Sequence, residues 1–274
     1  MKIGQALRTE RLRLGLSQQE MCDGIISRPH YAKVEKGMYM INSENLFQIL
    51  LKNKIDIMEF CELIQNTYNS QENKIDNQLQ IEIDYAVNTK NVNEIEEYAE
   101  EIISTSKNEI LKLRAIVTAA YFKGDVEKLS MQVREKIKKE FDEGRHWTRR
   151  PESLKLFANT MPLWAQDELD FFIGRLLMTV EKESFSELML ERYLRIFANY
   201  LAICYERKIS EEKGHISEVI KYIILKATSF HLMIYRTTGI YMHLLFNGNK
   251  EEAQEIRESM KKCGYENLIS SWPK

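Results

Sequence analysis

The sequence predicts an all-α fold with two domains, a small N-terminal domain and a larger helical one. It contains only four prolines and eleven glycines in 274 residues, so few positions interrupt a helix. Apolar residues recur at helical spacing, for example over 92–121. A polar, asparagine-rich stretch at 67–77 separates the two parts. We therefore expect a domain at 1–66, a linker at 67–77 and a helical domain at 78–274.

The charge distribution suggests that any nucleic-acid contact is confined to the N-terminal domain. The chain has 39 basic and 41 acidic residues and a net charge of −2, so it is not basic as a whole. Residues 1–40 carry seven basic and four acidic side chains, a local charge of +3, which leaves about −5 on the remainder. The sign of this asymmetry fits a DNA-binding N-terminus on a mildly acidic body.

The cysteines and the hydropathy indicate neither a metal site, a disulfide framework nor a membrane segment. Cys22, Cys61, Cys204 and Cys263 are scattered and form no C-x-x-C pair. No segment approaches 18 uninterrupted apolar residues, and the first residues lack a signal-peptide core. We expect a cytoplasmic protein without a membrane partner, a metal or another cofactor.

The N-terminal region has the local signals of three short helices. Residues 2–13 form an amphipathic pattern. Ser17 and Glu20 have the spacing of a capping box, which predicts that a second helix starts there. Ser27 can cap a third helix that ends at Gly37. Two short helices joined by a glycine-containing turn are typical of a helix-turn-helix.

At these residues the chain resembles the Cro/C1-type (XRE) helix-turn-helix family. The matching elements are Arg11, Leu16, Ser17, Gln18, Glu20, Met21, Ser27, Val34, Glu35, Lys36 and Gly37. The resemblance implies that Arg11 and Glu35 form an internal ion pair between the first and third helices. That role is structural and concerns no DNA contact.

The same resemblance implies which side chains meet DNA. Gln18 is expected to contact a phosphate, and Ser27, Arg28, His30 and Lys33 are expected to face the major groove. Arg28 is the first choice for a base contact, because its planar guanidinium can bind N7 and O6 of guanine together. Lys33 suits a phosphate equally well, and His30 is either a DNA contact or an exposed histidine without a specific role.

A longer run of residues resembles the Rgg (Rgg/GadR/MutR) family of Gram-positive regulators. The resemblance covers 26–37, 41–50 and 59–60, with a weaker match at 154–160. It implies a homodimer and a C-terminal domain of tetratricopeptide-like repeats. For many members it also implies sensing of a short hydrophobic signalling peptide that is re-imported into the cell for quorum sensing.

The repeat character of the C-terminal domain has limited support in the sequence itself. The segments around Gly124 and Gly248 share the pattern F-x-G-[DN]-x-E, as expected of repeated helix-turn-helix corners. A plain helical bundle remains the alternative, because amphipathic helices alone do not establish a solenoid.

Comparison with the Rgg family places four candidate peptide-binding residues in the C-terminal domain. Arg150 is expected to pair with a carboxylate of the peptide, and Asn159 to hold its backbone. Tyr222 and Lys226, four residues apart on one helix face, are expected to add contacts from a later helix. For each residue the alternative is a solvated charge or a satisfied polar group of the core.

These observations predict a sequence-specific DNA-binding transcriptional regulator whose repeat domain senses a signalling peptide. The alternative keeps the DNA-binding domain but makes the helical domain a dimerisation scaffold without a peptide ligand. An enzyme is not expected, because the five histidines have no ligand spacing and the chain has no G-x-S-x-G or P-loop motif.

Overall fold

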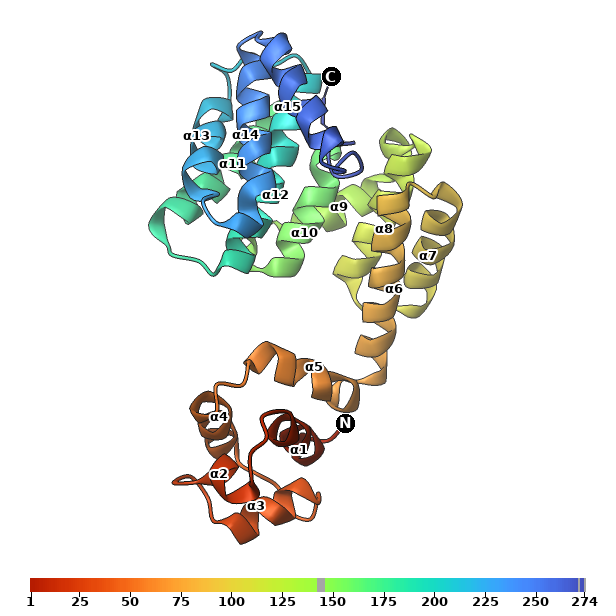
Figure 1. Cartoon of the computed structure of the whole chain (residues 1–274). Coiled ribbons are helices and arrows are strands. Elements are labelled where there is room, and N and C mark those ends of the chain that lie inside the picture. The colour runs from red at the N-terminus through yellow and green to blue at the C-terminus, as the bar shows by residue number, and fades with distance from the viewer. Residues whose placement is uncertain (142–145, 271, 274) are drawn as a thin grey trace. The chain divides into compact units, whose positions relative to one another are not determined.

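The computed structural model describes residues 1–141, 146–270 and 272–273 and divides the chain into two compact units (Figure 1). Unit 1 comprises Met1–Gln78 and unit 2 comprises Leu79–Lys274. Across the described residues the regular elements are all helical and no strand occurs. The predicted all-α fold is therefore confirmed.

Unit 1 is built from five helices and the first turns of a sixth. They are α1 (Ile3–Arg13), α2 (Gln18–Cys22), α3 (Arg28–Glu35), α4 (Ser43–Lys52), α5 (Ile57–Tyr68) and α6 (Gln71–Thr89). The predicted capping box starts α2: the Ser17 hydroxyl accepts from the amide of Glu20 at 3.2 Å, and the Glu20 carboxylate accepts from the amide of Ser17 at 2.7 Å. Ser27 is the N-cap residue of α3, although its side chain makes no capping hydrogen bond there.

Helices α1 and α3 pack unusually closely at Gly4. A Cβ atom at Gly4 would lie 1.9 Å from the carbonyl oxygen of Val34, so no larger residue fits without separating the helices. The core around this contact is formed by buried side chains from all five helices. They are Ala6, Leu7, Met21, Cys22, Tyr31, Val34, Ile49, Leu50, Ile55 and Phe60.

Most of the segment that the sequence suggested as a linker is helical. Helix α5 extends through Tyr68 and α6 begins at Gln71, so only Asn69 and Ser70 lie between the two helices. The polar composition of 67–77 reflects exposed helix surface there, because most of these side chains are open to solvent. The division between the units falls at the end of this segment, within α6.

Unit 2 consists of successive helices, and several consecutive pairs pack together (Figure 1). After the rest of α6 come α7 (Val92–Thr105), α8 (Glu109–Lys123), α9 (Met131–Glu140), α10 (Pro151–Thr160), α11 (Gln166–Lys182), α12 (Glu187–Glu206), α13 (Ile216–Lys226), α14 (Met233–Phe246) and α15 (Lys250–Lys262). Short 3₁₀ turns connect them at Val126–Lys128, Trp147–Arg149, Met161–Leu163 and Phe230–Leu232. The consecutive pairs that pack together include α7 with α8, α13 with α14 and α14 with α15. Helices α8, α10, α12 and α14 contact one another in that order, which gives the unit a continuous layer.

The two similar corners of the sequence have similar geometry at their glycines. Gly124 and Gly248 both adopt positive φ, 72° and 75°, a conformation that glycine reaches without strain. They lead into different elements, because a 3₁₀ turn follows the first and α15 follows the second. The repeated pattern thus marks helix ends and does not mark identical repeats.

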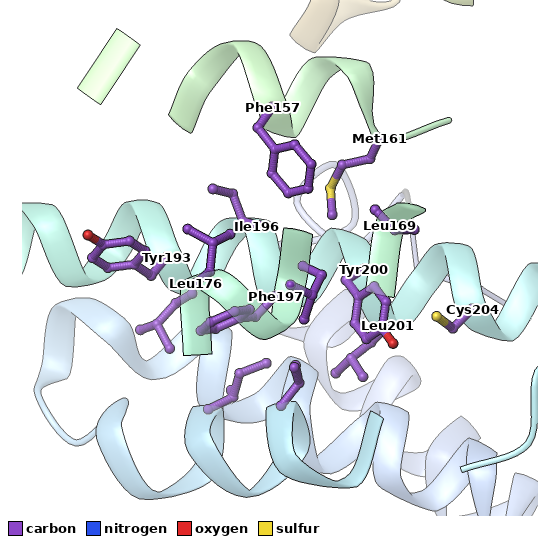
Figure 2. Close-up of a cluster of buried hydrophobic side chains, with 14 of the residues drawn as sticks. Phe157, Met161, Leu169, Leu176, Tyr193, Ile196, Phe197, Tyr200, Leu201 and Cys204 are labelled. Carbon is purple, nitrogen blue, oxygen red and sulfur yellow. The ribbon is translucent and has the colours of Figure 1, made fainter. Parts of the chain in front are cut away.

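The core of unit 2 is centred on α12 (Figure 2). Tyr193, Phe197 and Leu201 of this helix are fully buried. Figure 2 shows Phe157 of α10 and Leu176 of α11 directed toward the same cluster. A fully buried aromatic side chain contributes several kcal/mol through its area and contacts, so α12 organises the unit.

In the described part of the chain, no helix is long and apolar enough to cross a membrane.

Candidate functional site

Helix α3 and its N-cap carry four of the five side chains that the sequence predicted as DNA contacts. Arg28 and Lys33 are exposed, and His30 is half-buried on the same short helix. Ser27 is exposed at the N-terminus of α3, where free backbone amides attract phosphate. The opposite face of α3 is anchored by Tyr31 and by Val34. The helix is therefore fixed in unit 1 while its cationic face stays open.

Arg11 and Glu35 form a buried ion pair that joins α1 to α3. The Nε atom of Arg11 lies 2.6 Å from Oε1 of Glu35, and the two side chains are 12% and 4% exposed. Burial alone would raise the pKa of Glu35, but hydrogen bonds from Arg11 and Gln18 and the charge of Arg11 hold it below its usual value. Arg11 also donates to the carbonyl of Leu16 at 2.9 Å, which ties down the turn before α2.

Gln18 takes part in this buried pair as well as lying at the start of α2. Its Nε2 atom donates to Oε2 of Glu35 at 2.9 Å, and the side chain is half-buried. The side-chain amide is therefore already engaged within unit 1. A phosphate contact from Gln18 would use its backbone amide at the helix N-terminus, or would require the Glu35 contact to break.

In unit 2, a groove of about 320 Å³ lies among α6, α7, α8, α10 and α12. Its apolar lining residues are Ile83, Val87, Ile102, Leu111, Ala115 and Ala158. Its polar lining residues are Gln80, Asp84, Arg114, Thr118, Lys155, Asn159 and Arg195. The three cations exceed the single carboxylate of the lining, so the groove favours an anionic group among apolar ones.

Arg114 is the most constrained of these groups. The residue is 7% exposed, and its guanidinium donates to Oε1 of Gln80 at 2.6 Å. The Oε2 atom of Glu152 lies 3.6 Å away. Burial lowers the pKa of Arg114, and the negative charges of Asp84 and Glu152 offset this effect only in part. Its Nε atom is buried without a hydrogen-bond partner among the described residues, so one donor remains unused.

The four predicted peptide-binding residues do not form one cluster. Asn159 lines the groove, where its amide donates to Oγ1 of Thr118 at 3.0 Å. Arg150 is an exposed residue at the start of α10, 4.0 Å from the nearest oxygen of Glu140. The described lining of the groove does not include Arg150 or the two α13 residues discussed next.

Tyr222 and Lys226 lie on α13 and differ strongly in environment. Tyr222 is half-buried with its ring edge-on to Phe197, 5.4 Å between centroids, and burial raises its pKa to about 12. Lys226 is exposed at the end of the helix. The Tyr222 ring therefore packs against the core of unit 2.

Sequence reasoning missed most of the groove. Arg114 carries a signal that could have been used, because it interrupts an apolar run between Leu113 and Ala115 in the middle of α8. A charged residue on a buried helix face needs a partner or a ligand. Gln80 carries no such signal, because α6 is rich in polar residues. Arg195 carries the same signal as Arg114, because it lies between the apolar residues Leu194 and Ile196 of α12.

Comparison with known proteins identifies the domain type of the N-terminal unit and the fold. Residues 7–60 match the family model for a helix-turn-helix domain. No curated protein matches the sequence. The N-terminal unit is thus a helix-turn-helix domain, as its local signals predicted.

Several solved structures share the fold of the whole chain. The Rgg2 receptor for the SHP pheromone from Streptococcus dysgalactiae has a TM-score of 0.74 at 16% identity, over 98% of this chain and 97% of that one. A protein from Listeria monocytogenes EGD-e described as a transcriptional regulator has a TM-score of 0.76 at 20% identity, over 98% and 93%. PrgX in complex with cCF10 has a TM-score of 0.66 at 16% identity, over 99% and 97%. The chain therefore has an N-terminal helix-turn-helix domain and shares its fold with the pheromone receptor Rgg2 and with PrgX.

Proposed function

We propose that this protein is a sequence-specific DNA-binding transcriptional regulator whose helical unit senses a short peptide. The observation that carries the proposal is the combination, in one chain, of a cationic exposed helix α3 with a mixed apolar and cationic groove in unit 2. Support also comes from the fold shared with Rgg2, a pheromone receptor, and with PrgX bound to cCF10.

The DNA-binding part rests on α3. Arg28, at its first turn, is exposed and suits a bidentate contact to guanine in the major groove. Lys33, five residues further on, suits a phosphate or a second base. Because a single helix-turn-helix buries little surface on DNA, we propose a homodimer that binds two half-sites about 34 Å apart.

Footprinting of the purified full chain on DNA flanking its own gene tests this part. We expect protection of an inverted repeat, and loss of protection in Arg28→Ala. The matched control is Lys250→Ala, which removes a positive charge from α15 in unit 2 and leaves α3 unchanged. Protection that persists in Arg28→Ala, or is lost equally in Lys250→Ala, contradicts the assignment of α3 as the reading helix.

The peptide-sensing part rests on the groove. Its apolar walls suit a hydrophobic peptide segment, and its cations suit a carboxylate of that peptide. The unpartnered Nε of Arg114 offers a hydrogen bond that a ligand carbonyl or carboxylate can accept. Of the residues predicted from sequence, we keep Asn159 in this role, because it lines the groove. Arg150, Tyr222 and Lys226 lie outside the described lining, so we assign them no contact with the peptide in the groove.

One observation favours the alternative of a ligand-free dimerisation scaffold. Arg114 already donates to Gln80, and Asn159 already donates to Thr118, so part of the groove is satisfied internally. Titration of the full chain with short hydrophobic peptides encoded beside its gene separates the two functions. Saturable binding that Lys155→Met weakens supports peptide sensing. DNA binding together with no peptide binding supports the scaffold.

A further inference from the structure

The chain that follows α3 is folded back onto the helix. Gly37 adopts a φ of 71°, which turns the backbone after the last helical residue. The amides of Met38 and Tyr39 both donate to the carbonyl of Lys33, at 2.9 and 3.3 Å. These bonds hold Tyr39 at a fixed place beside the last turn of α3.

The side chain of Tyr39 contacts two of the residues predicted to meet DNA. The Nζ atom of Lys33 lies 4.6 Å from the centre of the Tyr39 ring and donates to its hydroxyl at 3.4 Å. The ring of His30 meets the same ring edge-on, with 5.6 Å between centroids and 76° between planes. Tyr39 thus contacts both Lys33 and His30.

Tyr39 does not serve the core of unit 1. It is 51% exposed and is absent from the described core cluster of this unit. Its neighbours Met38 and Met40 are 69% and 95% exposed, so the segment as a whole lies on the surface. The packing of Tyr39 against Lys33 and His30 is therefore not explained by burial of apolar area.

We infer that Tyr39 is a positioning residue for DNA reading, which holds Lys33 and His30 in a restricted set of orientations. This inference rests on the proposed DNA-binding function. A lysine side chain has a long flexible stem, and ordering it on binding lowers affinity. A rigid aromatic ring that attracts the ammonium group restricts the stem before DNA arrives. The contacts of Tyr39 with Lys33 and His30 thus increase the affinity for the correct DNA site.

The test uses the full chain and double-stranded DNA selected by the wild-type protein from a randomised library. An exposed cation–π contact predicts that Tyr39→Leu weakens binding to the selected site about two- to fivefold at fixed salt. Tyr39→Phe keeps the ring, so it should retain most of the affinity. The matched control is Tyr68→Leu, the same change at an exposed tyrosine of α5. An equal loss in Tyr39→Phe and Tyr39→Leu would overturn the inference that the ring positions the two side chains, because it would assign the effect to the hydroxyl alone.

A comparison of combined variants separates positioning from independent contact. If Tyr39 acts through Lys33 and His30, then Tyr39→Leu should have little further effect in a background that carries Lys33→Met and His30→Ala together. Tyr39→Leu and that background should also relax preference at the same base positions. Additive losses, or relaxed preference at different positions, would overturn the inference while leaving the regulator function intact. If the wild-type chain selects no sequence from the library, the proposed function itself fails.

Discussion

Removal of Arg11 should destabilise the helix-turn-helix domain far more than removal of a neighbouring arginine. In Arg11→Met, Glu35 stays buried with 4% of its side chain exposed and loses its opposite charge. Breaking a buried pair in this way costs about 3–5 kcal/mol. Because 12% of Arg11 is exposed, we expect the lower end, about 3 kcal/mol. For a domain of this size that corresponds to a decrease in Tm of about 12 °C or more.

Hydrogen exchange of the full chain measures this effect locally. The free energy of opening is read from peptides covering residues 1–60 at pH 7, with Arg8→Met as the control because Arg8 is exposed on the same helix. If the free energies of opening of Arg11→Met and Arg8→Met differ by less than about 0.5 kcal/mol, the Arg11–Glu35 pair contributes no more than an exposed ion pair does. That result would refute the expected cost of about 3 kcal/mol.

The same pair should make the domain sensitive to acid. The pKa of Glu35 is lowered in the folded state, so its contribution to stability is fully present above the unfolded value, about 4.3, and is lost as pH falls through the lower folded value. Arg11→Met removes the hydrogen bond and the charge that lower the pKa of Glu35, so this pKa should be higher in the variant than in the wild type. The difference in free energy of unfolding between the two proteins should therefore shrink as pH falls from the folded pKa of the variant to that of the wild type. If the difference in free energy of unfolding between the wild type and Arg11→Met is constant from pH 7 to pH 3, Glu35 does not cause it.

Three further substitutions test the packing and the caps. Ser17→Ala removes the capping box of α2 and should cost about 0.5–2 kcal/mol, measured by urea denaturation. Gly4→Ala forces a Cβ onto the carbonyl of Val34, so we expect loss of cooperative unfolding of unit 1 in calorimetry; an unchanged transition would show that the helices separate easily. Phe157→Ala should cost about 3–5 kcal/mol in unit 2, whereas Phe171→Ala, at a 58% exposed position, should change the Tm little.

The candidate site in unit 2 was harder to predict from the sequence than the one in unit 1, because its residues come from several helices. The DNA-facing residues lie within one short helix, so local spacing and family resemblance identify them together. The lining of the groove comes from Gln80, Arg114, Asn159 and Arg195 on four different helices. No local pattern relates residues as far apart in the sequence as the groove pairs Arg114–Gln80 and Asn159–Thr118, which are separated by 34 and 41 residues.

The sequence by itself determined the helical class, the helix-turn-helix and many helix ends. Its signals are short-range ones: the Ser17 capping box, the positive-φ glycines and the apolar periodicity each act within one or two turns. Only the tertiary structure decided that Tyr222 packs into the core, that Gln18 is engaged by Glu35 and that Arg114 is buried beside a groove. These outcomes depend on which helix faces meet, and that is set by the summed packing of distant side chains rather than by any local preference.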